Sequence, residues 1–201
     1  YTDFFVKFHG WYDSPGWIHI AMEYCQLGDL QCYLKNAQLC PDSRLPGGQV
    51  QDIAAQILDA LSLMHGENFA HRDLKPANIL IKKQPPDQWW VKLCDLGLSK
   101  RIGDRASTAI QGTTGFIPPE LLGYSGDPKT EDPCLGDMWC LGELVFQTLT
   151  GQATFDSVAE LGKYCSGMEP FPYQALRERN ESEAVIEFVK STMHSKLSER
   201  L

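Results

Sequence analysis

The sequence predicts an α+β fold, in which a short β-rich N-terminal part precedes a mostly helical body. Two observations lead to this prediction. Residues 4–24 contain two β-prone runs around a turn signal, and most of the chain after residue 25 repeats its apolar side chains at helical spacing. A chain of 201 residues with 43% hydrophobic side chains is large enough for one domain with a well-formed core.

The N-terminal part is expected to be a β-hairpin. Phe4–Phe8 and Trp17–Met22 are rich in aromatic and β-branched residues, and the sequence Asp-Ser-Pro-Gly at 13–16 is a turn signal between them. A short helix is predicted after Asp29, because the apolar residues from Leu30 to Ala37 recur at helical spacing.

Longer helices are predicted in the body. Apolar residues recur at steps of three and four from Val50 to Met64, and Gly66 would lie just past the end of that helix. Residues 136–150 are apolar on most faces, which predicts a buried central helix ended by Gly151. The sequence Asn-Glu-Ser-Glu at 180–183 is typical of a capping box and predicts a further amphipathic helix.

Two short strands, Ile79–Ile81 and Val91–Cys94, are expected between the two longest helices. The prolines between them indicate a loop or the tip of a hairpin. Residues 96–119 are irregular and rich in Gly, Ser and Thr, so a long loop is predicted there. Long loops in compact domains are usually functional or mobile.

The composition narrows the classes of partner. A net charge of −8 and a pI near 5.1 argue against nucleic-acid binding. No apolar run approaches the roughly 20 residues of a membrane helix. The 7 cysteines contain no Cys-x-x-Cys pair, which argues against zinc and disulfide frameworks and favours buried thiols in a reducing compartment. We therefore expect an intracellular protein, cytoplasmic or nuclear, without membrane or nucleic-acid partners.

The most informative stretch is His-Arg-Asp-Leu-Lys-Pro-Ala-Asn at 71–78, followed by Asp-Leu-Gly at 95–97. It places a carboxylate, a lysine and an asparagine on one short loop, with a second carboxylate 17 residues later. Phosphoryl transfer needs such a set: a group that orients the attacking hydroxyl, a cation beside the moving phosphate, and oxygen ligands for magnesium. A lone Asp or Asn on a loop is usually a turn residue, but the order and spacing of the whole set favour catalysis.

These motifs resemble the eukaryotic protein kinases, specifically their Ser/Thr branch. The resemblance implies a protein-kinase-like α+β fold, with hinge strands and a mostly helical C-terminal lobe. It also implies transfer of the γ-phosphate of Mg-ATP to Ser or Thr hydroxyls of protein substrates. Asp73 would orient the hydroxyl and Lys75 would lie beside the γ-phosphate, while Asn78 and Asp95 would bind Mg2+. Leu96 stands where the family usually has Phe, and it is apolar enough to fill the same internal stack.

The sequence Gly-Thr-Thr-Gly-Phe-Ile-Pro-Pro-Glu at 112–120 resembles the end of a kinase activation segment, although a Gly-Pro-rich turn is the plain alternative. By resemblance, Thr113 would hydrogen-bond near the catalytic loop, and Glu120 would pair with Arg200. Asp137 would hold the backbone of the catalytic loop. Its alternative is a carboxylate favoured by the dipole at a helix N-terminus.

The segment Ile-Ala-Met-Glu-Tyr-Cys resembles the hinge between kinase lobes. Met22 would then guard the back of the adenine pocket, and backbone groups of Glu23 and Cys25 would bond the adenine. Asp29 would reach the ribose, and Leu80 would form the floor under the base. The alternative is an apolar strand followed by an ordinary helix-capping Asp.

Arg72, next to the catalytic Asp, marks kinases that are often switched by phosphorylation of the activation loop. A phosphate adds negative charge that arginine can pair with. Ser107, Thr108 and Thr114 are the candidate sites for an upstream activating kinase. Ordinary loop hydroxyls are the alternative for each.

The 201 residues contain no Gly-x-Gly-x-x-Gly sequence and no Val-Ala-x-Lys strand. Residues 1–201 are therefore expected to be a partial kinase domain, with 1–24 a remnant of the small lobe and hinge start and 25–201 the large lobe. Such a chain is expected to be inactive alone, because half of its ATP cleft would be open to water. The alternative function is a truncated kinase or pseudokinase that acts as a protein-binding module. Leu96–Lys100 and Gly115–Ile117 look closest to the calcium/calmodulin-dependent-like group, of fungal type.

Overall fold

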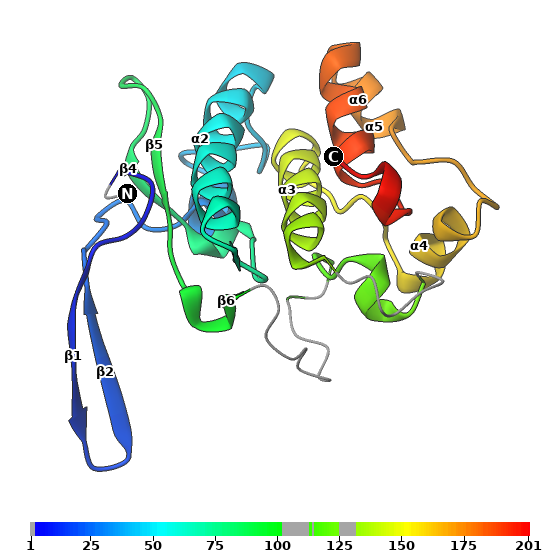
Figure 1. The fold of residues 1–201 in the computed structure, drawn as a ribbon. Helices are drawn as coiled ribbons and strands as arrows, with labels where there is room; N and C mark the ends of the chain where they lie inside the picture. The colour runs from blue at the N-terminus through cyan, green and yellow to red at the C-terminus, as the bar shows by residue number, and fades with distance from the viewer. Residues whose placement is uncertain (1–2, 102–112, 114, 125–131) are drawn as a thin grey trace.

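The computed structural model consists of a β-hairpin that extends from one side of a helical body (Figure 1). The predicted α+β class is therefore confirmed. The termini lie apart, with the N-terminus beside β4 and the C-terminus near α6. The structure describes residues 3–101, 113, 115–124 and 132–201.

Strands β1 (Phe8–Ser14) and β2 (Trp17–Met22) form the hairpin, with Trp11 opposite Ile20. The turn between them uses Gly16 at φ 81°, a conformation that glycine adopts without strain. The prediction of a first strand at Phe4–Phe8 was wrong by several residues.

The physical reason for that error is that the apolar run was read as a hairpin strand when most of it packs on the body. Phe5 forms an isolated bridge with Leu93, and Val6 donates its N–H to the carbonyl oxygen of Leu93 at 3.0 Å. Phe4 and Phe5 also pack against the hydrophobic core. Burial against β5 therefore explains their apolar character.

Strands β4 (Ile79–Lys83) and β5 (Trp90–Leu93) pair antiparallel, close to the predicted positions. Two further strands, β3 (Phe69–Ala70) and β6 (Lys100–Arg101), were not indicated by the sequence. They pair antiparallel with each other, although β3 precedes β4 in the chain and β6 follows β5. This pairing fixes the chain at residue 70, where the loop that leads to β4 begins.

Three predicted helices are present with adjusted ends. Helix α1 (Leu30–Lys35) is capped by the Asp29 carboxylate, which accepts the Cys32 N–H. Helix α2 (Gly47–Gly66) includes Gly66, contrary to the prediction that this glycine lies past its end. Helix α3 (Pro133–Thr150) begins three residues before the predicted position, because Asp132 caps it and a proline occupies its first position, and it ends at Gly151 as predicted.

The C-terminal part carries α4 (Val158–Cys165), α5 (Gln174–Glu178) and α6 (Glu183–Thr192). Ser182 caps α6 by accepting the Val185 N–H, so the helix begins two residues later than a cap at Asn180 would place it. Helix α4 was missed. The sequence Ser-Val-Ala-Glu at 157–160 is typical of a capping box and could have indicated it. In the structure, the Ser157 hydroxyl accepts the Glu160 N–H. The remaining helical pieces are 3-10 turns, η1 (Pro76–Asn78), η2 (Leu96–Leu98), η3 (Pro119–Leu122) and η4 (Leu197–Glu199).

Helix α3 lies at the centre of the body, with α2 on one side and α6 on the other (Figure 1). Side chains on most of its faces are buried, including Trp139 and Phe146. This confirms the predicted central helix.

Every cysteine lies in the described part of the chain as a free thiol, but Cys32 is exposed, so the prediction of buried thiols was wrong there. In the described residues no helix is long and apolar enough to cross a membrane.

Candidate active site

The catalytic loop, residues 71–78, runs from the end of β3 into the η1 turn, and its polar side chains meet at Asp73. One carboxylate oxygen of Asp73 accepts from Lys75 Nζ at 2.7 Å and from Asn78 Nδ2 at 3.0 Å. Asn78 Nδ2 also donates to the Asp73 carbonyl oxygen at 2.7 Å. The Asp73 side chain is 8% exposed, so its charge is held in a site that water reaches only in part. These contacts hold the carboxylate in one orientation.

Thr113 joins this network from the loop before η3. Its hydroxyl accepts from Lys75 Nζ at 2.8 Å and donates to the other carboxylate oxygen of Asp73 at 3.2 Å. The structure thus brings together three residues, Asp73, Lys75 and Thr113, that lie up to 40 positions apart in the chain. A hydroxyl group already sits in hydrogen-bond contact with the carboxylate, which is the contact an acceptor hydroxyl would make.

Asp137, on helix α3, fixes the backbone at the start of the catalytic loop. Its two carboxylate oxygens accept the N–H groups of His71 and Arg72, each at 2.8 Å, and the carboxylate is fully buried. Asp137 is the fifth residue of α3, so its oxygens are used on the loop rather than on the end of its own helix. The contact holds Arg72 at φ 68°, a left-handed conformation that is uncommon for a residue other than glycine.

His65 is a residue of this site that the sequence analysis missed. Its Nε2 atom lies 2.8 Å from the same Asp137 oxygen that accepts the His71 N–H. Helix α2, helix α3 and the catalytic loop therefore converge on one buried carboxylate. Nothing in the local sequence around His65 indicates a contact 72 residues away.

Asn78 and Asp95 are the residues expected to bind magnesium. The Cys94 N–H donates to the Asn78 carbonyl oxygen at 3.0 Å, which places Asp95 one residue beyond this link. Asp95 is exposed, has φ 59°, and accepts the Gly97 N–H at 3.2 Å. Within the described residues, no hydrogen bond or ion pair joins Asp95 to Asp73, and no group of three or more His, Cys, Asp and Glu side chains forms a metal cluster.

The donor set nevertheless fits a hard cation that also binds phosphate. Magnesium is usually held by one or two protein carboxylates together with substrate phosphates, so a cluster of three is not required. The Asn78 amide nitrogen is engaged with Asp73, which directs the amide oxygen to the other side of the group. Burial raises the pKa of the neighbouring Cys94 thiol to about 11, which favours the neutral thiol near neutral pH.

The expected nucleotide-binding residues lie where β2 leads into α1 and along β4. Met22 ends β2 and is 48% exposed, whereas Cys25 is buried. Asp29 caps α1 and forms an isolated bridge with Leu80, which is half-buried on β4. The capping role that was the alternative for Asp29 is thus present.

Glu23 forms an ion network that the sequence did not indicate. One carboxylate oxygen lies 2.8 Å from Lys82 Nζ, and the other lies 2.8 Å from Lys92 Nζ. The hydrogen bond from Lys82, followed by that from Lys92, lowers the pKa of Glu23 to about 2. Its own N–H donates to the Lys7 carbonyl oxygen at 2.8 Å, so the Glu23 amide is already occupied by the protein.

Glu120 and Arg200 form a bidentate pair in the helical lobe. Arg200 Nη1 and Nη2 donate to the two Glu120 carboxylate oxygens at 2.7 and 2.8 Å, and the two side chains are 0% and 3% exposed. The pair connects the end of the activation segment to the C-terminal turn. The candidate phosphorylation sites Ser107, Thr108 and Thr114 lie outside the described residues.

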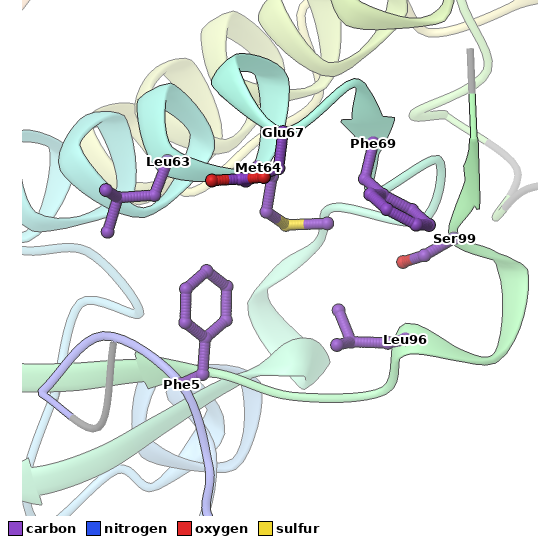
Figure 2. A pocket seen from close by; sticks show the side chains of 7 residues that line it. All are labelled: Phe5, Leu63, Met64, Glu67, Phe69, Leu96 and Ser99. Atoms are coloured by element: carbon purple, nitrogen blue, oxygen red, sulfur yellow. The ribbon is translucent and has the colours of Figure 1, made fainter.

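A separate apolar cavity of about 400 Å3 lies beside η2 (Figure 2). Figure 2 shows Phe5 and Leu96 facing side chains from the end of α2 across this space. Leu96 is 51% exposed, so the expectation that it fills an internal stack was wrong. The cavity is lined by Phe5, Leu63, Met64, Glu67, Phe69, Leu96 and Ser99.

A family model described as the protein kinase domain matches residues 2–201. The chain belongs to the protein kinase family. The serine/threonine-protein kinase dkf-2 of Caenorhabditis briggsae is 31% identical over 201 residues, and serine/threonine-protein kinase D3 of Mus musculus is 28% identical over 190 residues. Both alignments cover 94% of this chain, which spans 16% and 20% of those two relatives. The predicted protein kinase domain is confirmed, and these two relatives are named serine/threonine-protein kinases.

The fold agrees with solved kinase structures. The Rad53 kinase domain, crystallised with SCD2 in complex with AMPPNP, matches with a TM-score of 0.75 and 27% identity, over 98% of this chain and 68% of that one. A longer Rad53 chain, residues 1–466 with AMP-PNP, matches with a TM-score of 0.77 and 28% identity, over 98% of this chain and 47% of that one. The protein-kinase-like architecture predicted from the motifs is therefore confirmed.

Proposed function

We propose that the protein carrying this chain transfers the γ-phosphate of Mg-ATP to Ser or Thr hydroxyls of protein substrates. The observation that carries the proposal is the network in which Lys75, Asn78 and Thr113 all contact Asp73. A carboxylate held by a cation, an amide and a hydroxyl suits a reaction in which positioning and charge neutralisation provide most of the rate.

Each residue has a separable role in this proposal. Asp73 accepts the hydrogen bond of the substrate hydroxyl and orients its oxygen toward the phosphate. Lys75 balances the negative charge of Asp73 and of the phosphate. Thr113 joins Lys75 to Asp73 through its hydroxyl, and the substrate hydroxyl binds to the Asp73 carboxylate beside it. Asp137 keeps the loop backbone in the conformation that these contacts need.

Asn78 and Asp95 would hold Mg2+ through their side-chain oxygens. When bound, this ion neutralises charge on the phosphates of the nucleotide. Met22, Glu23, Cys25, Asp29 and Leu80 would line the adenosine site, with the backbone of the hinge contacting the base.

We also propose the finer assignments that the motifs suggest. Residues 1–24 correspond to part of the small lobe and the start of the hinge, and residues 25–201 to the large lobe. The kinase is placed in the calcium/calmodulin-dependent-like group, of fungal type, with an intracellular location. Phosphorylation by an upstream kinase at Ser107, Thr108 or Thr114 would raise its activity through Arg72. The 201 residues alone, which contain no Gly-x-Gly-x-x-Gly sequence, are expected to show no measurable transfer.

A transfer assay tests the proposal. The natural gene product is incubated with γ-labelled ATP, Mg2+ and a basic protein, and the labelled amino acids are identified. We expect label on Ser and Thr, and a fall in kcat of roughly 10²- to 10⁴-fold for Asp73→Asn. Asp87→Asn, the same chemical change at an exposed position between β4 and β5, should leave kcat unchanged. An Asp73→Asn enzyme with the wild-type rate would remove Asp73 from its proposed role.

A further inference from the structure

Main-chain contacts hold both ends of residues 23–29, the hinge segment that follows β2, and ion pairs hold its N-terminal end as well. At its C-terminal end, the Ile81 N–H donates to the Gly28 carbonyl oxygen at 2.9 Å, and Asp29 bridges to Leu80. These are main-chain contacts that side-chain changes leave in place. At its N-terminal end, the Glu23 N–H donates to the Lys7 carbonyl oxygen at 2.8 Å, and the Glu23 carboxylate also holds the segment to β4 and β5 through Lys82 and Lys92.

The N-terminal anchor is well built. Lys92 is 5% exposed and Glu23 is 20% exposed, so the Lys92–Glu23 pair is shielded from water much more than an ordinary surface ion pair. The same carboxylate also accepts the Lys7 N–H at 3.2 Å. Lys92 lies 5.2 Å from the centre of the Trp90 ring, which limits where its ammonium group can go. The Glu23 carboxylate is thus contacted from β4, from β5 and from the residues before β1.

Between the two anchors, Cys25 is buried and the Gly28 N–H donates to the Cys25 carbonyl oxygen at 3.0 Å. Tyr24 is 81% exposed and Leu27 is 41% exposed, so these side chains add little packing. On the N-terminal side of the buried Cys25, the ion pairs of Glu23 are therefore the side-chain contacts that fix the backbone. This stretch carries the groups that would face an adenine.

We propose that Glu23, Lys82 and Lys92 form a positioning clamp that sets the adenine-facing backbone of the hinge, and so determines affinity for ATP without taking part in phosphate transfer. This inference rests on the proposed function. The clamp lies on the hinge and on the β4–β5 strands, whereas Lys75 and Thr113 contact Asp73 on the catalytic loop. Its loss should therefore raise KM for ATP and leave kcat nearly unchanged.

The size of the effect follows from the fraction of time the released hinge spends in the binding-competent position. If that fraction falls to between a fifth and a tenth, KM for ATP rises about five- to tenfold, since apparent affinity scales with the competent fraction. A residue that only stabilises the fold would change the melting temperature without this split between KM and kcat.

The test uses steady-state kinetics of the natural gene product at varied ATP concentration. Glu23→Gln keeps the shape of the side chain and removes its charge. The matched control is Glu187→Gln, which removes the same charge from an exposed pair with Lys190 on α6. We expect KM for ATP to rise about five- to tenfold in Glu23→Gln, with kcat within about twofold, and neither constant to change in the control.

Glu23→Gln leaves the buried Lys92 ammonium unpaired, so melting curves are recorded first. If that variant does not fold, Lys82→Gln removes the other, partly exposed arm of the clamp and is expected to raise KM for ATP by a smaller factor. An active enzyme whose KM is unchanged in whichever variant folds would overturn the clamp and leave the proposed function standing. A wild-type protein with no kinase activity would overturn the proposed function and the clamp together.

Discussion

Replacing Arg200 with Ala should destabilise the helical lobe more than removal of an exposed charge. The Arg200 guanidinium makes two hydrogen bonds to Glu120 and also donates to the carbonyl oxygens of His194, at 2.9 Å, and Leu135, at 3.1 Å. It lies 5.1 Å from the centre of the Trp139 ring. The substitution therefore removes these four hydrogen bonds and leaves the buried Glu120 carboxylate without the Arg200 charge.

The magnitude follows from that burial. Breaking a buried pair by removing one partner costs about 3–5 kcal/mol, because the remaining charge keeps its desolvation penalty without its counter-ion. For a domain of this size, a loss of 1 kcal/mol lowers the melting temperature by about 2–4 °C, so the expected fall is roughly 6–20 °C. Arg200→Lys keeps a positive charge but loses the two parallel hydrogen bonds, so it should fall between Ala and wild type.

Urea denaturation followed by tryptophan fluorescence measures the effect. We expect a lower midpoint with an unchanged slope, the result of lost stability rather than of a changed unfolded state. Lys190→Ala serves as control, since it breaks an exposed pair with Glu187 on α6 that is worth about 0.2–0.5 kcal/mol. An Arg200→Ala midpoint equal to that of the control would refute the argument that the buried pair stabilises this lobe.

Two more predictions concern buried carboxylates of α3. Burial raises the pKa of Glu143 above its ordinary 4.5, so its contribution to stability is present below that pH and is lost as pH rises through the folded-state pKa. In wild type, the urea midpoint should fall as the pH rises from 4.5 through the folded-state pKa of Glu143. This fall should be absent in Glu143→Gln, whose side chain carries no charge but can still accept the Thr154 N–H. Equal pH profiles of the two proteins would contradict this. Asp137→Leu should cost about 2–6 kcal/mol, since the buried N–H of His71 and the partly buried N–H of Arg72 lose their acceptor. Faster amide exchange at these two residues checks this, and unchanged exchange would show that the loop holds its conformation without Asp137.

Local patterns in the sequence were sufficient for several features. The periodicity of α2 and α3 placed both helices, because a helix repeats its buried face within a few residues. The catalytic loop was found because its polar residues lie within eight positions of one another, at spacings that chance rarely produces. The turn before β2 needed only its proline and glycine.

The tertiary structure decided the features that depend on distant partners. The sequence of Phe4–Phe8 is as apolar as a strand, but Phe4 and Phe5 pack against the hydrophobic core, and main-chain contacts join Phe5 and Val6 to Leu93 of β5. A side chain gives the same local pattern whatever surface buries it, so the sequence alone assigned this segment to the wrong partner.

Charge pairs show the same limit. Glu23 and Lys92 are 69 residues apart, and His65 and Asp137 are 72 residues apart. Each residue alone is an ordinary polar side chain, and no local spacing relates it to its partner. The sequence by itself therefore determined the two longest helices and the chemical groups of the catalytic loop, because these depend on neighbouring residues. The resemblance to kinases supplied the Glu120–Arg200 pair, but only the folded chain showed that Glu23 meets Lys82 and Lys92 and that His65 meets Asp137, because Coulomb energy and desolvation depend on distance and burial in space.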